Sequence, residues 1–313
     1  MSLIRRTVVQ LRRLPHDPRN WRPNILLFAG DVSRRGQLVR IASSLVADRG
    51  ILTVSKLLVG AVDEHASTVD AERNKLAHDL EELGVIAFPE VEIVPSYESG
   101  AVTVAQSNGI AGIESNTVMI GWTDKPDRQP MVMRVVSSVA QLGMSSIICM
   151  PHEREWRRRR RVIHVWWGGL QENGDLLILF AHLLSLSPNW RGSEIVINSI
   201  ATNDMTMTRN EGLLRKLIGA SRIDARAEVI LKPEGVKVQD IIRERSADAD
   251  IVLLGLRGTE PGDEAKHATR ITKMAEGLPT VLFVRSAGEF RGQLLGDMDD
   301  VAQAATEDVA EQR

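Results

Sequence analysis

The residues best placed to bind a small anionic ligand follow the first and fourth predicted strands. Asp31, Arg34 and Arg35 come just after the apolar run 25–28, and Gly121 lies near the end of a later apolar run. In an open parallel sheet, ligands bind beyond the carboxyl ends of the strands, where helix N-termini offer backbone N–H groups to anions. The aspartate could bind a ribose hydroxyl, and the arginines could bind phosphates. These four residues form a candidate nucleotide site. The alternative is ordinary turns, where glycine and aspartate are common for backbone reasons alone.

The other chemistry-bearing residues form no catalytic or metal-binding pattern. The seven histidines are scattered, and the chain has no His-Glu-x-x-His pair, no Walker loop and no Gly-x-Ser-x-Gly elbow. Cys149, the one cysteine, lies in an apolar run and is interpreted as a small core residue. His164 lies inside a predicted strand, where a hydrogen-bonded core histidine is more common than a ligand. We therefore expect a protein that is not an enzyme and holds no metal.

The length and composition favour two globular domains. The chain has 313 residues, of which 43% are hydrophobic, and this is enough for two ordinary cores. A net charge of −2 argues against a general nucleic-acid-binding protein, whose domains carry a positive excess. A single cysteine excludes a disulfide scaffold within the chain and favours a cytoplasmic setting. No apolar run reaches the roughly 20 residues of a membrane span, so the chain as given is expected to be soluble.

Strands and helices are expected to alternate in both halves, which predicts an α/β class with two tandem open, mainly parallel sheets covered by helices on both faces. Apolar runs place strands of the first half at 25–28, 51–59, 90–94, 116–122 and 146–150. Ser33 is expected to cap the first helix. In the second half, the stretch 161–200 reads as a strand, a leucine-rich helix and another strand, and further strands follow at 228–231, 251–254 and 280–284. Helices are expected between these strands, among them 209–218.

Three segments lie outside these two predicted subdomains. Residues 1–20 form a basic connector and residues 154–161 an arginine-rich linker, whereas residues 287–313 form an acidic tail. The basic character of the first two fits a solvated surface, and the alternative is contact with an anionic partner or with lipid headgroups. The two subdomains are expected at 21–153 and 162–286.

Short stretches of the two halves resemble each other. Thr117–Gly121, TVMIG, is echoed by Ile251–Gly255, IVLLG. Asn-Trp-Arg occurs at 20–22 and again at 189–191, each time before a predicted strand. These echoes are interpreted as a weak internal duplication, that is, a pseudo-repeat.

Four stretches in order resemble the cytosolic C-terminal domain of cation-chloride cotransporters and related amino-acid-permease-type carriers. They are Asn-Trp-Arg-Pro at 20–23, NTVMIGW at 116–122, the region with HVWW at 164–167, GDL at 174–176 and Trp-Arg at 190–191, and GLPTVLFVR at 277–285. The resemblance covers most of residues 20 to 288.

This resemblance implies two subdomains similar to universal stress proteins, a homodimer, and a position beneath a membrane transport domain of the same polypeptide, on the cytoplasmic face. The implied role is assembly and regulation of transport without catalysis. The family and the universal stress proteins can hold ATP at the strand-rim site, which corresponds here to Asp31, Arg34, Arg35 and Gly121. ATP is thus the one cofactor that the resemblance suggests.

Two departures from the family pattern limit what the resemblance implies. The second half has Gly255-x-x-Gly258, but the Gly-Ser/Thr that completes the universal-stress phosphate motif is absent, since Ala268-Thr269 stands near that position. His164 replaces the usual aspartate, and the long regulatory insertion of animal members is missing. The rival hypothesis is a free-standing nucleotide-binding protein or enzyme of the doubly wound class.

Overall fold

The computed structural model describes residues 21–46, 49–110, 113–152, 160–168, 173–221 and 223–288. The basic connector 1–20, most of the arginine-rich linker and nearly all of the acidic tail lie outside the described residues. The described part divides into two compact units. The first takes its residues from Met1–Cys149, Gly258–Thr269 and Ala287–Glu289, and the second from Met150–Arg257 and Arg270–Ser286.

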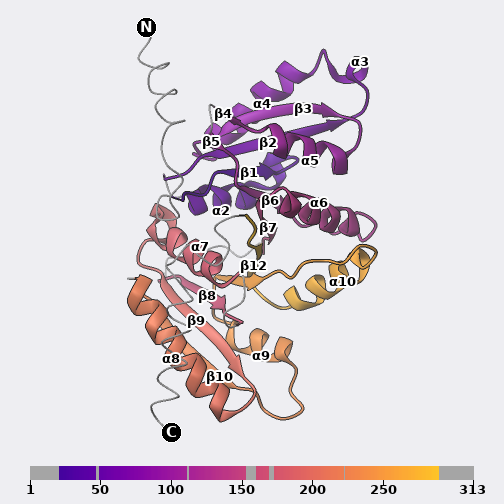
Figure 1. The fold of residues 1–313 in the computed structure, drawn as a ribbon. Coiled ribbons are helices and arrows are strands. Elements are labelled where there is room, and N and C mark those ends of the chain that lie inside the picture. The colour runs from indigo at the N-terminus through magenta and orange to yellow at the C-terminus, as the bar shows by residue number, and fades with distance from the viewer. Residues whose placement is uncertain are drawn as a thin grey trace. The chain divides into compact units, whose positions relative to one another are not determined.

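The first unit is a five-stranded parallel sheet (Figure 1). Its strands are β1 (Ile25–Phe28), β2 (Leu52–Val59), β3 (Phe88–Val94), β6 (Thr117–Gly121) and β7 (Ser145–Met150). They lie in the order β7-β6-β1-β2-β3, and every pair is parallel. The central strand β1 is fully buried along ILLF, because helices cover both faces of the sheet.

The helices of the first unit connect these parallel strands. They are α2 (Gly36–Val46), α4 (Val69–Glu82), α5 (Tyr97–Ser107) and α6 (Gln129–Gln141), with the 3-10 turn η2 (Val32–Arg34) before α2. Crossovers between parallel strands are right-handed, and the strand order reverses direction after β3. This places α2 and α4 on one face of the sheet and α5 and α6 on the other, where α5 packs against α6.

The second unit repeats this arrangement (Figure 1). Its strands are β8 (Val162–Trp166), β9 (Glu194–Ala201), β10 (Arg226–Leu231), β11 (Ile251–Gly255) and β12 (Thr280–Arg285). They lie in the order β12-β11-β8-β9-β10, again all parallel. Its helices are α7 (Gly174–Leu186), α8 (Asp204–Ser221) and α9 (Val238–Arg245), and the 3-10 turn η3 spans Pro188–Trp190. Helix α10 (Glu264–Ala275) precedes β12, and its residues up to Thr269 are grouped with the first unit.

Numbered along the chain, both units place their strands in the order fifth, fourth, first, second, third, so the predicted pseudo-repeat is confirmed at the level of topology. The TVMIG and IVLLG echo falls on β6 and β11, the fourth strand of each unit. The Asn-Trp-Arg echo is different, because it precedes the first strand of one unit and the second strand of the other. That echo therefore does not reflect the duplication.

The structure corrects several local expectations. Asp31, and not Ser33, caps the turn after β1: its side chain accepts a hydrogen bond from the Ser33 backbone N–H. Helix α8 begins five residues earlier than expected, because the side chain of Asn203 accepts the backbone N–H of Thr206 and supplies a cap. The short helix α3 (Val62–His65) and the antiparallel pair of β4 (Gly109–Ile110) and β5 (Ile113–Glu114) were not expected.

Cys149 and His164 are buried, as expected. Burial raises the pKa of the Cys149 thiol, so it stays protonated in the core of the first unit. In the second unit, Nδ1 of His164 lies 3.2 Å from the hydroxyl of Ser246, which also accepts a hydrogen bond from Nε1 of Trp166 at 3.0 Å. His164 therefore has a structural partner in Ser246, the C-cap residue of α9.

Candidate functional site

The sequence-predicted site residues all line one pocket of the first unit. Asp31, Arg34, Arg35 and Gly121 border a cavity of about 860 Å³ at the carboxyl ends of β1, β2, β3 and β6. The strand order reverses between β1 and β6, which is the switch point where open α/β sheets bind ligands. The expectation that ligands bind beyond the carboxyl ends of the strands thus identified residues that follow or end two separate strands, β1 and β6, and that line the same cavity.

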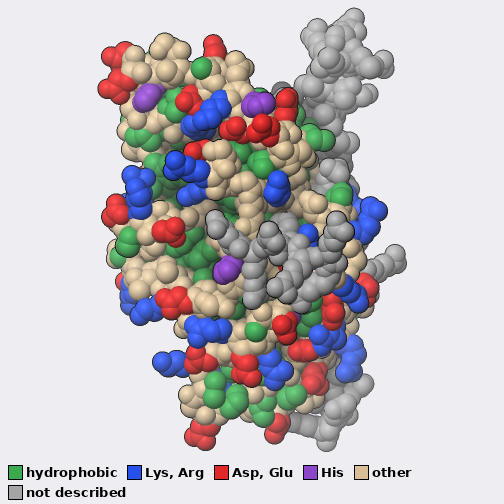
Figure 2. Space-filling model, turned by 180° about the vertical axis from the view of Figure 1, so that it is seen from behind, with side chains coloured by type: hydrophobic (Ala, Val, Ile, Leu, Met, Phe, Trp, Pro, Cys, Tyr) green, Lys and Arg blue, Asp and Glu red, His purple; other side chains and the backbone are tan. Residues whose placement is uncertain are grey.

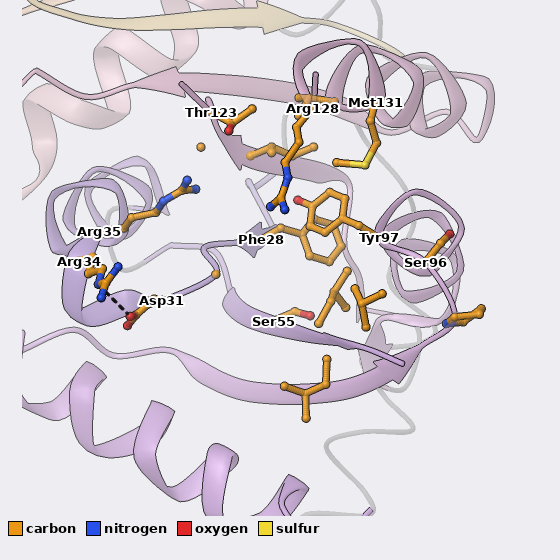
Figure 3. A pocket seen from close by; sticks show the side chains of 18 of the residues that line it. Phe28, Asp31, Arg34, Arg35, Ser55, Ser96, Tyr97, Thr123, Arg128 and Met131 are labelled. Atoms are coloured by element: carbon orange, nitrogen blue, oxygen red, sulfur yellow. Dashed lines mark ion pairs between the residues drawn. The ribbon is translucent and has the colours of Figure 1, made fainter. Parts of the chain in front are cut away.

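The turn after β1 holds Asp31 in place. Its carboxylate accepts the Ser33 hydroxyl at 2.7 Å and the Ser33 backbone N–H at 3.2 Å, and it pairs with the guanidinium of Arg34 at 3.5 Å. The hydrogen bond from the Ser33 hydroxyl is the main reason that the pKa of Asp31 lies below its ordinary value. Figure 3 shows this ion pair at one side of the pocket. Asp31 is therefore an ionised, oriented acceptor, and Arg34 is partly neutralised by it.

The side chain of Arg35 packs against the backbone of Gly121. A Cβ atom placed on Gly121 would lie 2.8 Å from Nη1 of Arg35 and 2.8 Å from a methyl group of Leu38. Gly121 ends the buried strand β6, and its missing side chain leaves the space that the arginine occupies. The sequence singled out this glycine as a rim residue, and the structure shows that it gives Arg35 room at the switch point.

Arg128 is a cationic residue of the pocket that the sequence analysis did not identify. It is the N-cap residue of α6, and Figure 3 shows its side chain directed toward Phe28 and Tyr97. Within the described ranges, neither Arg35 nor Arg128 forms an ion pair with a carboxylate. Two guanidinium groups without an acidic partner in one cavity favour an anionic ligand. No sequence pattern pointed to Arg128, because it follows a polar loop without glycine-rich spacing.

The remaining wall of the pocket is largely apolar. The rings of Phe28 and Tyr97 meet edge to face with centroids 6.3 Å apart, and burial raises the pKa of Tyr97 to about 12. Other apolar lining residues are Leu57, Leu58, Val59, Pro95 and Met131. A cavity with a cationic side and an apolar side matches a ligand that carries both a phosphate and a flat ring.

A polar network lies beside this pocket. The Ser55 hydroxyl, which lines the cavity from β2, donates to the carboxylate of Glu92 on β3 at 2.8 Å. The side-chain amide of Asn108 donates to Glu90 at 2.8 Å. Burial, and after it the nearby charge of Glu90, raise the pKa of Glu92 to about 7.

The equivalent rim of the second unit contains a different arrangement. Asn173 precedes α7, and its side-chain amide donates to the Leu256 carbonyl at 3.1 Å while its oxygen accepts the Ser286 N–H at 2.8 Å. These backbone groups follow β11 and β12. One side chain therefore links the ends of two adjacent strands.

Three further findings concern the surface charge, metal ligands and membrane spans of the described residues. On the face drawn in Figure 2, acidic and basic side chains are interspersed across the coloured surface. No group of three or more His, Cys, Asp or Glu side chains among the described residues could hold a metal ion. Among the same residues, no helix is both long and apolar enough to cross a membrane.

Comparison with known proteins confirms the resemblance that the sequence motifs indicated. No family model matches the chain. A potassium/chloride cotransporter 3 from Caenorhabditis elegans is 24% identical over 255 residues, which cover 75% of this chain and 23% of that protein. The chain thus spans about a quarter of the length of this curated relative.

Solved structures show the same fold. The cytoplasmic domain of a prokaryotic cation chloride cotransporter matches with a TM-score of 0.59 and 15% identity, covering 87% of this chain and 98% of that one. A universal stress protein from Archaeoglobus fulgidus matches with a TM-score of 0.57 and 14% identity, covering 87% and 99%. The chain is therefore homologous to part of a potassium/chloride cotransporter and has the α/β fold shared by a cotransporter cytoplasmic domain and a universal stress protein.

Proposed function

We propose that this chain is a cytosolic regulatory and dimerisation domain of a secondary membrane transporter of the cation-chloride cotransporter type, without catalysis of its own. The observation that carries the proposal is the sequence match to a potassium/chloride cotransporter over 255 residues. The fold match to a cotransporter cytoplasmic domain supports it. In this proposal the domain lies at the cytoplasmic face, and the arginines among residues 1–20 contact anionic lipid headgroups.

The reading frame that encodes the chain tests the association with a transporter. Membrane spans encoded in the same frame would support the proposal, and the flux of chloride in vesicles would then be compared between the whole transporter and a form lacking this domain. Loss or deregulation of flux is the expected result. A frame that encodes no membrane span would contradict a transport domain of the same polypeptide.

The pocket of the first unit is proposed to bind an adenine nucleotide as a regulatory ligand. Arg35 and Arg128 would bind the phosphates, Asp31 would accept a ribose hydroxyl, and the apolar side would hold the base. Such a ligand would link the state of the domain to the nucleotide supply of the cell.

Titration calorimetry with ATP and ADP tests this assignment. Replacing Arg35 with alanine is expected to weaken binding by about 10- to 100-fold, the usual worth of a charge-assisted hydrogen bond. Arg40→Ala is the matched control, because Arg40 is an exposed arginine of α2 that does not line the pocket. Equal affinity in the two variants would contradict the assignment.

Self-association is a separate part of the proposal. Light scattering of the chain at tens of micromolar, the range of a weak interface, is expected to give twice the mass of one chain. A monomer at that concentration would contradict strong self-association by this part of the protein.

A second candidate is a free-standing nucleotide-binding protein or enzyme. The match that covers 99% of a universal stress protein favours it. Turnover of ATP by the purified chain, lost on Arg35→Ala, would favour this candidate over a transporter domain. The absence of nucleotide binding would remove its support.

A further inference from the structure

The network beside the pocket joins the cavity to a pair of carboxyl groups. Ser55 on β2 and Glu90 on β3 are register partners, and Glu92 follows two residues later on the same face of β3. The Ser55 side chain is almost fully buried, yet it lines the cavity and donates to Glu92 at 2.8 Å. Ser55 thus lines the ligand cavity and is hydrogen-bonded to Glu92.

Among the residues that the structure describes, no cation forms an ion pair with Glu92. Glu90 lies on the same strand and accepts from Asn108, which follows α5. Arg73 of α4 has only a weak electrostatic effect on Glu92 and pairs with Asp70. On α5, Glu98 pairs with Arg134, and Lys56 on the neighbouring strand pairs with Glu72. Tyr97 is kept neutral by burial. Burial and the nearby charge of Glu90 therefore favour the protonated form of Glu92.

The protonation state of Glu92 decides what Ser55 offers to a ligand. When Glu92 is ionised, the Ser55 hydrogen is used in the bond to the carboxylate, and only oxygen lone pairs face the cavity. When Glu92 carries a proton, it can donate to Ser55, and the Ser55 hydrogen is free to bond an acceptor in the cavity. The negative charge of a phosphate ligand favours the same protonated state.

We propose that binding of an anionic ligand in the first-unit pocket takes up one proton from solution onto Glu92, with Ser55 as the positioning residue that transmits the effect. The proton ends on a Glu92 oxygen, and no other bond is made or broken. This inference rests on the proposed nucleotide site and adds a means of regulation to it: occupancy falls as the cytosol becomes more alkaline.

Calorimetry with ADP between pH 6 and pH 8 tests the coupling. ADP itself titrates in this range, so Glu92→Gln serves as the reference in which only the ligand's own ionisation remains. Relative to this reference, the affinity of the native chain is expected to fall about fivefold from pH 6 to pH 8, the size of one hydrogen bond. Measurements in Hepes and Tris, whose ionisation heats differ, are expected to show added proton uptake in the native chain alone.

Three further variants separate the coupling from a structural effect. Ser55→Ala is expected to bind more weakly at pH 6 and to lose the extra pH dependence. Glu90→Gln removes the like charge and is expected to move the midpoint to lower pH. Glu98→Gln, the control on α5, is expected to keep the native profile. Should Glu92→Gln not fold, the comparison of Ser55→Ala with the native chain gives the same information.

Each outcome bears on one of the two proposals. Binding with the same pH profile in the native chain and in Glu92→Gln would overturn the coupling and leave the nucleotide site intact. Failure of ADP to bind at any pH would overturn both. A profile that is lost in Glu92→Gln and kept in Glu98→Gln would support the coupling.

Discussion

The two units have the same strand order but differ at their switch points. In the first unit, the ends of β1 and β6 border a cavity with Arg35 beside Gly121. In the second unit, the side chain of Asn173 bonds to backbone groups beyond β11 and β12. Among the described residues Arg35 forms no ion pair with a carboxylate, whereas the Asn173 amide is hydrogen-bonded to two backbone groups. The comparison teaches that one topology can border a cavity with a guanidinium group in one copy and carry an internal amide link in the other.

The largest expected difference between the units is the sign of their pH dependence. Burial lowers the pKa of His164 in the second unit to about 4, so between its ordinary 6.5 and 4 only the unfolded chain binds the proton. The contribution of neutral His164 to the stability of this unit is therefore fully present above pH 6.5 and is lost as the pH falls toward 4. Its size is up to about 3 kcal/mol, from 1.36 kcal/mol per pKa unit.

In the first unit the sign is reversed. The pKa of Glu92 is raised from 4.5 to about 7, so the folded state binds the proton more strongly. The stabilisation by this proton is complete below pH 4.5 and is lost as the pH rises through 7. Hydrogen exchange measured at pH 5 and pH 7 is expected to show the first unit less protected and the second more protected at the higher pH. The expectation would be wrong if protection changed with pH in the same direction in both units. It would also be wrong if the pH dependence of protection persisted in Glu92→Gln and His164→Asn.

Removal of the Asn173 side chain is expected to have the next largest effect. Asn173→Ala leaves the Leu256 carbonyl and the Ser286 N–H without this partner, which costs about 2 kcal/mol of unfolding free energy. Urea denaturation followed by the fluorescence of the buried Trp166 and Trp167 would measure it. Arg35→Ala is the matched change in the first unit, and it is expected to cost less than about 0.5 kcal/mol because the arginine binds no acidic group within the described ranges. Equal losses of unfolding free energy in the two variants would show that both side chains stabilise the fold to the same extent.

The smallest expected effect concerns the glycines that end the fourth strands. In Gly121→Ala the new Cβ would lie 2.8 Å from Arg35 and Leu38, so we expect a loss of about 1 kcal/mol and weaker nucleotide binding. In Gly255→Ala the nearest atom is the Asn173 amide nitrogen at 3.4 Å, which requires little adjustment. Thermal melts of the two variants would measure the difference in stability. A larger loss of stability in Gly255→Ala than in Gly121→Ala would contradict the expectation.

Much of the fold could be predicted from the sequence because the central strands are continuous apolar runs, as in ILLF and TVMIG. The rim residues Asp31, Arg34, Arg35 and Gly121 were also found, since strand ends meet at one edge of a parallel sheet. Arg128 and Ser55 were missed: the first lies in a polar loop, and the second is a hydroxyl within an apolar strand. Their positions depend on neighbours distant in the chain, and a local pattern does not contain that information.

The Asn173 link also constrains how the second rim could change during evolution. A substitution that placed an arginine at this position would strip partners from two backbone groups at once, before any ligand could repay the loss. Gain of binding there would require compensating changes in neighbouring loops, a form of epistasis. After duplication of an ancestral unit, a copy that acquired such an internal amide would therefore gain an arginine at this position less readily.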